Sequence, residues 1–184
     1  MTISACAERV TREAIQVTGM NEPPPFALAL RAAVLVRSML SRPYYLSLAA
    51  RGAPLPQTQD GLRAIGAGQC GDQAQLFVDV MRKLGFDAQQ WGFRYGDDRT
   101  HVGTEIAWNG EWHYFDITWG AYWGEAAQPW SLDEVLEAAA NGDLTRERVA
   151  DEFGLSLTGD EDPFEYLDPD VDRWLLTNTH VVIA

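Results

Sequence analysis

The sequence predicts an α+β fold, on three observations. Apolar residues recur at helical spacing over residues 70–84, which predicts an amphipathic helix. Three strand-like runs follow it, over 87–95, 101–108 and 111–118. The pair Asn109-Gly110 between the last two runs is the strongest short hairpin signal, because both central residues of such a turn take positive φ. We therefore expect a helix that precedes an antiparallel sheet.

Two helices are predicted ahead of this region. The first covers about residues 8–18, and the prolines at 23–25 then favour the start of a second helix over about 26–40. The nearly continuous apolar residues of the second helix predict burial on more than one side, and Pro43 is expected to end it. The glycine- and proline-rich stretch over 52–68 predicts an irregular surface segment.

The helix over 70–84 has the clearest pattern of all, with Gly85 placed to end it. Its apolar positions are Ala74, Phe77, Val78, Met81 and Leu84. After the hairpin, Ser131 and Glu134 form a capping-box pattern that predicts a further helix, which Asn141-Gly142 closes. Beyond it we expect a short helix over 145–153 and an edge strand over 180–184.

The composition is that of a folded protein. Charged residues make up 22% of the 184 positions and apolar residues of the AVILMFWYC set 46%, with seven tryptophans, unlike the profile of a disordered chain. This length supports a sizeable core, so we predict a single domain over residues 1–184 with its central motifs within 68–118.

The charge narrows the possible partners. A net charge of −13 repels phosphate backbones and anionic lipid headgroups, which argues against nucleic-acid and membrane partners, although solubility is the commoner meaning of such a charge. Residues 1–9 lack the pattern of a signal peptide, and no stretch approaches the ~20 apolar residues of a membrane span. Two cysteines are too few for a disulfide framework, so we expect a cytoplasmic protein. The oligomeric state and a removed targeting segment stay open.

Cys70 is the candidate nucleophile. The string Gly68-Gln69-Cys70-Gly71 places its thiol where a loop turns into a helix. The unpaired N–H groups and the dipole at a helix start favour the thiolate and lower the pKa of a cysteine from its usual value of about 8.5. The same amides can hold an oxyanion. A cysteine at a helix start is more often an inert small hydrophobe, so Cys70 needs partners to count as catalytic, and Cys6 is expected to be incidental.

The hairpin register selects the histidine. A two-residue turn at Asn109-Gly110 pairs Gly103 with Asp116, which puts His101 and Asp116 on one face as diagonal neighbours and His113 on the other. Diagonal residues lie about 7–8 Å apart at the backbone, a span that a carboxylate and an imidazole can bridge. Gly103 is expected to leave the space for this contact.

These residues form a set suited to nucleophilic catalysis. An aspartate that holds one ring nitrogen of His101 fixes the tautomer in which the other nitrogen faces the thiol. Glu105 shares this face and is the alternative partner, although a solvated or structural role is favoured. A zinc site from Cys70, His101, His113 and Asp116 lacks short paired ligand spacing, and its histidines lie on opposite faces, so no metal or other cofactor is expected.

The order of these motifs resembles the transglutaminase-like superfamily. Gly-Gln-Cys opens a helix at 68–70, Gly-Phe follows at 85–86, a histidine heads a strand, and residues 110–118 carry Gly-x-Trp-x-x-x-Asp-x-Thr. The resemblance covers about residues 68–118 and is to the small bacterial members. It implies a papain-like α+β fold, with the cysteine helix packed on an antiparallel sheet and additional N- and C-terminal helices.

The resemblance also implies a role for each residue. Cys70 would be the nucleophile, His101 the general base and then acid, and Asp116 the orienting group. The chain departs from the family in two places. Ile117 stands where the family commonly has the proline of Asp-Pro-Thr. The eukaryotic cross-linking members have a tryptophan directly after the cysteine and another upstream, whereas here Gly71 follows Cys70 and no tryptophan precedes Trp91. The second oxyanion donor is therefore unidentified, and the candidates are Gln57, Gln59 and Gln69.

The function predicted on this basis is that of a cysteine hydrolase, which cleaves an amide or peptide bond through a thioester and needs no cofactor. Alternatives are an acyltransferase that forms an amide with an amine in a biosynthetic pathway, an inactive binding module, and a subunit that organises a complex. The expected partner is a peptide or an amide-containing small molecule. The candidate substrate-binding residues are Gln69, Trp119, Tyr122 and Trp123.

Overall fold

The computed structural model describes residues 1–95, 99–125, 128–144 and 172–176, and is a mixed α+β structure. Its helices are α1 (Ile3–Thr18), α2 (Pro25–Met39), α3 (Arg42–Ala50), α4 (Gln59–Ile65), α5 (Cys70–Lys83) and α6 (Leu132–Ala140). Its strands are β1 (Asp87–Tyr95), β2 (Arg99–Trp108), β3 (Glu111–Phe115), β4 (Gly124–Glu125), β5 (Gln128–Pro129) and β6 (Asp172–Leu176). In these ranges no helix is long and apolar enough to cross a membrane.

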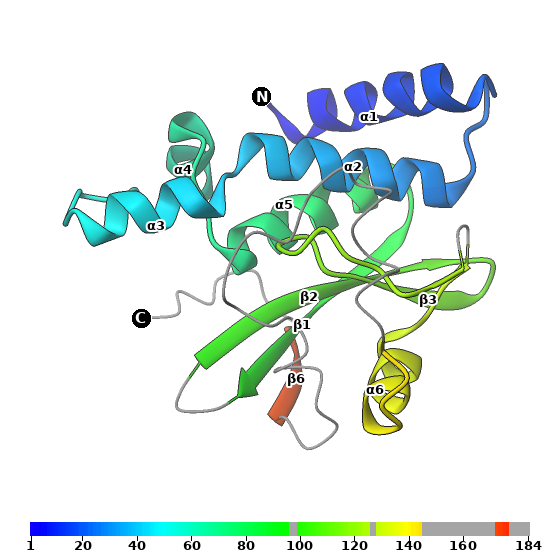
Figure 1. Ribbon diagram of the computed structural model, residues 1–184. Helices are drawn as coiled ribbons and strands as arrows, with labels where there is room; N and C mark the ends of the chain where they lie inside the picture. Colours follow the sequence, from blue (N-terminus) through cyan, green and yellow to red (C-terminus); the bar gives the residue numbers. More distant parts are fainter. Residues whose placement is uncertain (96–98, 126–127, 145–171, 177–184) are drawn as a thin grey trace.

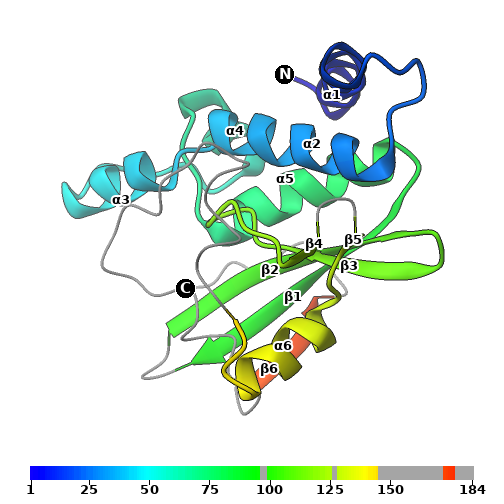
Figure 2. The same cartoon turned by 45° about the vertical axis from the view of Figure 1, so that its right-hand side comes forward.

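A four-stranded antiparallel sheet forms the middle layer. Its strand order is β3-β2-β1-β6, and β4 and β5 form a separate short pair. Helix α5 packs against β1 and β2, with α1 and α2 stacked beyond it, while α6 lies on the opposite side of the sheet (Figures 1 and 2). The predicted order of a cysteine-bearing helix followed by an antiparallel sheet is confirmed.

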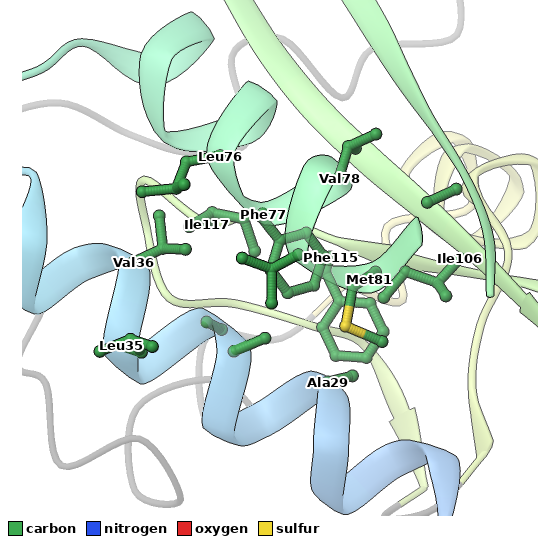
Figure 3. Close-up of a cluster of buried hydrophobic side chains, with 14 of the residues drawn as sticks. Ala29, Leu35, Val36, Leu76, Phe77, Val78, Met81, Ile106, Phe115 and Ile117 are labelled. Carbon is green, nitrogen blue, oxygen red and sulfur yellow. The ribbon is translucent and has the colours of Figure 1, made fainter. Parts of the chain in front are cut away.

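Two hydrophobic clusters hold these layers together. The larger one joins α2 and α5 to the face of the sheet that carries Ile106 and Phe115 (Figure 3). Phe77 of α5 and Phe115 of β3 lie at its centre, both fully buried, with ring centroids 6.0 Å apart. Burial of a phenylalanine contributes about 1.5–3 kcal/mol, so this contact fixes α5 firmly on the sheet. The smaller cluster lies under α6 and contains Phe93, Tyr114, Ala121, Trp123, Leu132, Val135 and Leu136.

The hairpin has the predicted turn and register. Asn109 and Gly110 have φ values of 55° and 85°, as a two-residue turn with positive φ requires. The ladder runs from the pair Trp108–Glu111 to the pair Thr104–Phe115. The expected pairing of Gly103 with Asp116 is wrong, because β3 ends at Phe115 and Asp116 instead exchanges backbone hydrogen bonds with Ala121, at 2.8 and 2.9 Å.

The helices before Cys70 differ from the prediction. Helix α1 begins five residues earlier than expected, where the hydroxyl of Thr2 accepts the N–H of Ala5 at 3.2 Å. Pro43 lies in the first turn of α3, where it is tolerated, rather than acting as a terminator of α2. The stretch 52–68 is not wholly irregular, because Thr58 caps the short helix α4. These short helices carry cap signals but little apolar periodicity, which is why the pattern missed them.

The C-terminal predictions are tested only in part. Helix α6 has the expected capping box between Ser131 and Glu134 and ends at Asn141-Gly142. The helix predicted over 145–153 and the strand over 180–184 lie outside the described residues. Strand β6 was not predicted, and the run Trp174-Leu175-Leu176 is the signal that would have found it.

The hairpin turn leads to a stability prediction. Because Gly110 has a φ of 85°, Gly110→Ala is expected to cost about 1–2 kcal/mol, measured as a lower urea midpoint of unfolding. Glu111→Ala is the control, since Glu111 is an exposed neighbour and its loss should stay within about 0.5 kcal/mol. Equal midpoints for the two variants would contradict the assigned turn.

Candidate functional site

Cys70 is held at the first position of α5 by a local capping network. Asp72, in the first turn, accepts the backbone N–H of Gln69 at 2.8 Å and the side-chain amide of Gln59 at 2.6 Å. An acidic residue at this position satisfies a helix-start donor and ties α4 to α5. Burial raises the pKa of Asp72 against the effect of these two hydrogen bonds. Cys70, the residue that follows the cap, is half-buried.

His101 and Asp116 meet in the interior. Nε2 of His101, near the start of β2, lies 2.6 Å from Oδ2 of Asp116, and their side chains are 6% and 0% exposed. The other carboxylate oxygen of Asp116 accepts the backbone N–H of Trp119 at 2.9 Å. The two side chains lie on one face, as the register predicted, although the ladder stops one residue before Asp116.

The thiol of Cys70 completes this chain of contacts. It makes a hydrogen bond with the side chain of His101 and accepts one from the backbone N–H of Val102. Because Nε2 of His101 is engaged by Asp116, Nδ1 is the ring nitrogen left for the thiol. The structure therefore brings the three predicted catalytic residues together in the order Cys70, His101, Asp116.

The electrostatics of the three residues favour a thiolate–imidazolium pair. Burial opposes the thiolate of Cys70, but the hydrogen bond and charge of His101 outweigh both burial and the repulsion from Asp116, so the pKa of Cys70 is lowered. Burial also opposes the imidazolium, yet the charge and hydrogen bond of Asp116, together with Cys70, raise the pKa of His101 to about 10. Both shifts favour the charged pair over the neutral thiol and imidazole.

Gly103 has a different role from the one expected. A Cβ at this position would lie 2.6 Å from Cε2 and 2.7 Å from Cζ of Tyr114, a fully buried residue. The space beside Gly103 is therefore filled by the Tyr114 ring and is not left open for the contact between His101 and Asp116. On its other side, Gly103 pairs with Trp91 of β1.

The alternative partner, Glu105, is engaged elsewhere. Its carboxylate accepts hydrogen bonds from the indole N–H of Trp91 at 2.6 Å and from the side chain of Gln89 at 2.9 Å. It also accepts the backbone N–H of Leu132 at 2.8 Å, at the start of α6. Glu105 thus joins β1, β2 and α6, and of the solvated and structural roles that were expected it has the structural one.

His113 lies apart from the three residues. Its ring stacks on Trp108 at 3.7 Å between centroids, and its Nδ1 lies 2.6 Å from the carbonyl oxygen of Pro129. This agrees with the predicted placement on the opposite face from His101. Cys6 is fully buried against α2, with its sulfur 3.8 Å from that of Met39.

The candidate substrate-binding residues divide into two pairs. Tyr122 and Trp123 are 3% and 1% exposed and belong to the larger and smaller hydrophobic clusters, so both pack the core and line no open surface. Trp119 is half-buried, and the guanidinium of Arg42 lies 5.6 Å from the centre of its ring. Gln69 is exposed directly before Cys70. Trp119 and Gln69 are therefore the two that retain accessible surface.

Two of the three glutamines considered as oxyanion donors already donate their side-chain amides to other groups. The side-chain amide of Gln59 donates to Asp72, and that of Gln57 donates to the carbonyl of Leu55 at 3.1 Å. The backbone N–H of Gln69 donates to the carboxylate of Asp72. The N–H groups in the first turn of α5 have no acceptor within the helix, so the amide of Cys70 remains the donor that the geometry favours.

Two residues near the site were missed by sequence reasoning. The buried side chain of Gln73, one turn after Cys70, donates to the carbonyl of Leu40 at 2.6 Å and accepts the hydroxyl of Thr118 at 2.9 Å. Arg37 of α2 donates to the carbonyl of Ile117 at 2.9 Å and to that of Thr118. No local sequence signal distinguished either residue, since Arg37 is one of two arginines in α2 and Gln73 lies between Asp72 and Gln75.

The described part of the chain contains no group of three or more His, Cys, Asp or Glu residues placed to hold a metal ion. No known protein family profile matches the sequence, and no curated protein is significantly similar to it.

Proposed function

We propose that this protein is a cysteine-dependent acyl enzyme that hydrolyses an amide or peptide bond. The observation that carries the proposal is the continuous contact from the Cys70 thiol through His101 to Asp116. A cysteine that is partly exposed, lies at a helix start and has a lowered pKa is suited to nucleophilic attack.

The proposed reaction has two halves. The Cys70 thiolate attacks the substrate carbonyl, and the N–H groups at the start of α5 stabilise the oxyanion. The His101 imidazolium then gives its proton to the departing amine as the C–N bond breaks, which leaves a thioester on Cys70. In the second half, His101 takes a proton from water, the hydroxide attacks the thioester, and the C–S bond breaks to release the acid. Cys70 returns to its thiolate, and His101 keeps the proton, which restores the starting pair.

A papain-like, transglutaminase-like fold is part of the same proposal. Its support is the packing of the cysteine helix α5 on an antiparallel sheet, with a histidine on β2 and an aspartate directly after β3. The chain order Cys, His, Asp is the one that the resemblance implies.

Transfer of the acyl group to an amine is the second candidate. His101 and Asp116 are 5% and 0% exposed, and shielding from water favours aminolysis of a thioester over its hydrolysis. The two fates share the first half-reaction and differ only in the acceptor.

Burst kinetics test the first half-reaction. A panel of p-nitrophenyl esters with acyl groups of increasing length should give a rapid release of about one nitrophenolate per protein, followed by slower turnover. Cys70→Ala should abolish the burst, and Cys6→Ala should retain it because Cys6 is fully buried. Absence of a burst across the panel, or its survival in Cys70→Ala, would favour the binding module. With a panel of added primary alkylamines at low concentration, saturable formation of the amide in place of the acid would identify an acyltransferase.

The pH dependence should differ between two leaving groups. An ester leaving group such as nitrophenolate needs no proton, so its rate should rise once, as Cys70 ionises, and then stay level. An anilide leaving group needs the proton of His101, so its rate should fall again as pH approaches about 10, the pKa of His101. Stopped-flow profiles for an acyl p-nitroanilide and the matching ester measure this, and a level anilide profile would exclude His101 as the acid.

A further inference from the structure

The turn that follows Asp116 is held from helix α2. The guanidinium Nη1 of Arg37 donates to the carbonyl of Ile117 at 2.9 Å and also to that of Thr118, the two residues directly after Asp116. Within the turn, Ala121 and Asp116 exchange backbone hydrogen bonds, and Trp119 donates to the Asp116 carboxylate. Arg37 thus fixes the backbone on which the Asp116 side chain is mounted.

Helix α5, which begins at Cys70, also makes a hydrogen bond to this turn. The Thr118 hydroxyl donates to the side chain of Gln73, which is 3% exposed and lies one turn after Cys70. The amide of Gln73 donates in turn to the carbonyl of Leu40, directly after α2. The position of Asp116 is therefore set by α2 and α5 together.

Charge supports this geometry. The groups that face the Asp116 carboxylate are His101 from β2, Cys70 from α5 and Arg37 from α2. Burial lowers the pKa of Arg37, and the charge of Asp116 acts in the opposite direction, so the guanidinium and the carboxylate attract each other. A carboxylate with no exposed surface needs such compensation to stay ionised.

We propose that Arg37 is a positioning residue that keeps Asp116 oriented toward His101. This inference rests on the proposed cysteine–histidine–aspartate site. The charge of Arg37 acts on Asp116, so an effect of Arg37 on the thiol is expected to pass through that carboxylate. If Arg37 only ties α2 to the turn, its replacement should change stability and leave the ionisation of Cys70 unchanged. If Arg37 positions Asp116, its replacement should also change the ionisation of Cys70.

The test is the pH dependence of iodoacetamide labelling at Cys70, resolved from Cys6 by peptide mapping. Arg37→Met should move the labelling midpoint upward and slow labelling at neutral pH by about three- to tenfold, since one pH unit is a tenfold change in thiolate. Arg37→Lys, which keeps the charge and one donor, should recover part of the shift. Arg31→Met is the matched control on the same helix and should leave the midpoint unchanged.

A second comparison shows whether the effect passes through Asp116. In an Asp116→Asn background, Arg37→Met should add no further shift, because the carboxylate it positions is already gone. An unchanged midpoint with a lower urea midpoint, or an equal shift in both backgrounds, would overturn the proposal. If Arg37→Met does not fold, the labelling midpoints of Arg37→Lys and Arg31→Lys are compared instead. A shift in Arg37→Lys alone supports the proposal, and equal midpoints overturn it.

The labelling needs no substrate, so this inference and the proposed function fail separately. A shifted midpoint without any acyl chemistry would retain the role of Arg37 and reject the enzyme. A nitrophenolate burst with an unshifted midpoint would retain the enzyme and reject the role of Arg37.

Discussion

His101→Ala is expected to slow the alkylation of Cys70 at neutral pH by at least about tenfold. The reason lies in the balance at Cys70, where burial raises its pKa and the hydrogen bond and charge of His101 bring it down. With His101 removed, burial and the Asp116 charge both oppose the thiolate. Labelling of Cys70 in His101→Ala is therefore expected to begin at a higher pH than labelling in the wild type.

His113→Ala is the matched control for this prediction. His113 lies on the same hairpin and is as buried as His101, at 3% against 5% exposed, but it contacts Trp108 and Pro129 rather than the thiol. Its loss should lower stability and leave the labelling rate of folded protein within about twofold. Equal slowing in the two variants would show that the pairing of Cys70 with His101 is wrong.

Gly103→Ala should have the largest effect on stability, a loss of about 1–3 kcal/mol or more. The new Cβ would lie 2.6 Å from a ring carbon of Tyr114, too close for any real contact. Tyr114 cannot move aside easily, because its ring packs on Trp123 at 5.9 Å and on Phe93 at 6.4 Å. Urea unfolding monitored by tryptophan fluorescence measures the loss.

Gly71→Ala provides the opposite case. Its φ is not positive, and an added Cβ would meet only Val102, at an ordinary 3.8 Å. Replacing a helical glycine under these conditions stabilises by about 0.4–1 kcal/mol. Both variants replace a glycine with an alanine, but Gly71→Ala should raise the free energy of unfolding and Gly103→Ala should lower it. A Gly103→Ala variant as stable as the wild type would mean that Tyr114 does not occupy the space beside β2.

The hairpin shows how far local signals carry. Asn109-Gly110 specifies a two-residue turn, and the ladder from Trp108–Glu111 to Thr104–Phe115 follows from it by counting. Strict alternation then assigns faces, so His101 could be chosen over His113 without any tertiary information. The helix start at Cys70 was predictable for the same reason, since its cap and its apolar spacing are local.

The surroundings of the site depend on contacts that sequence spacing does not encode. Arg37 lies 80 residues before the carbonyl of Ile117 that it holds, and nothing local marks it among the apolar residues of α2. Strand β3 ends at Phe115, directly before the turn that hydrogen bonds from Arg37 and with Gln73 hold in place. Gly103 was expected to leave space for the contact between His101 and Asp116, but the ring of Tyr114 fills that space, which only three-dimensional packing decides.

The catalytic role of Cys70 is tested most directly by trapping the acyl group on the protein. The chain is mixed with an activated ester that gives a burst, quenched in acid after the burst, and digested for peptide mapping by mass spectrometry. We expect one acyl group on the peptide that contains Cys70, sensitive to hydroxylamine as a thioester is, and strongly reduced in His101→Ala. An acyl group found equally on Cys6, or on lysines alone, would contradict this role of Cys70.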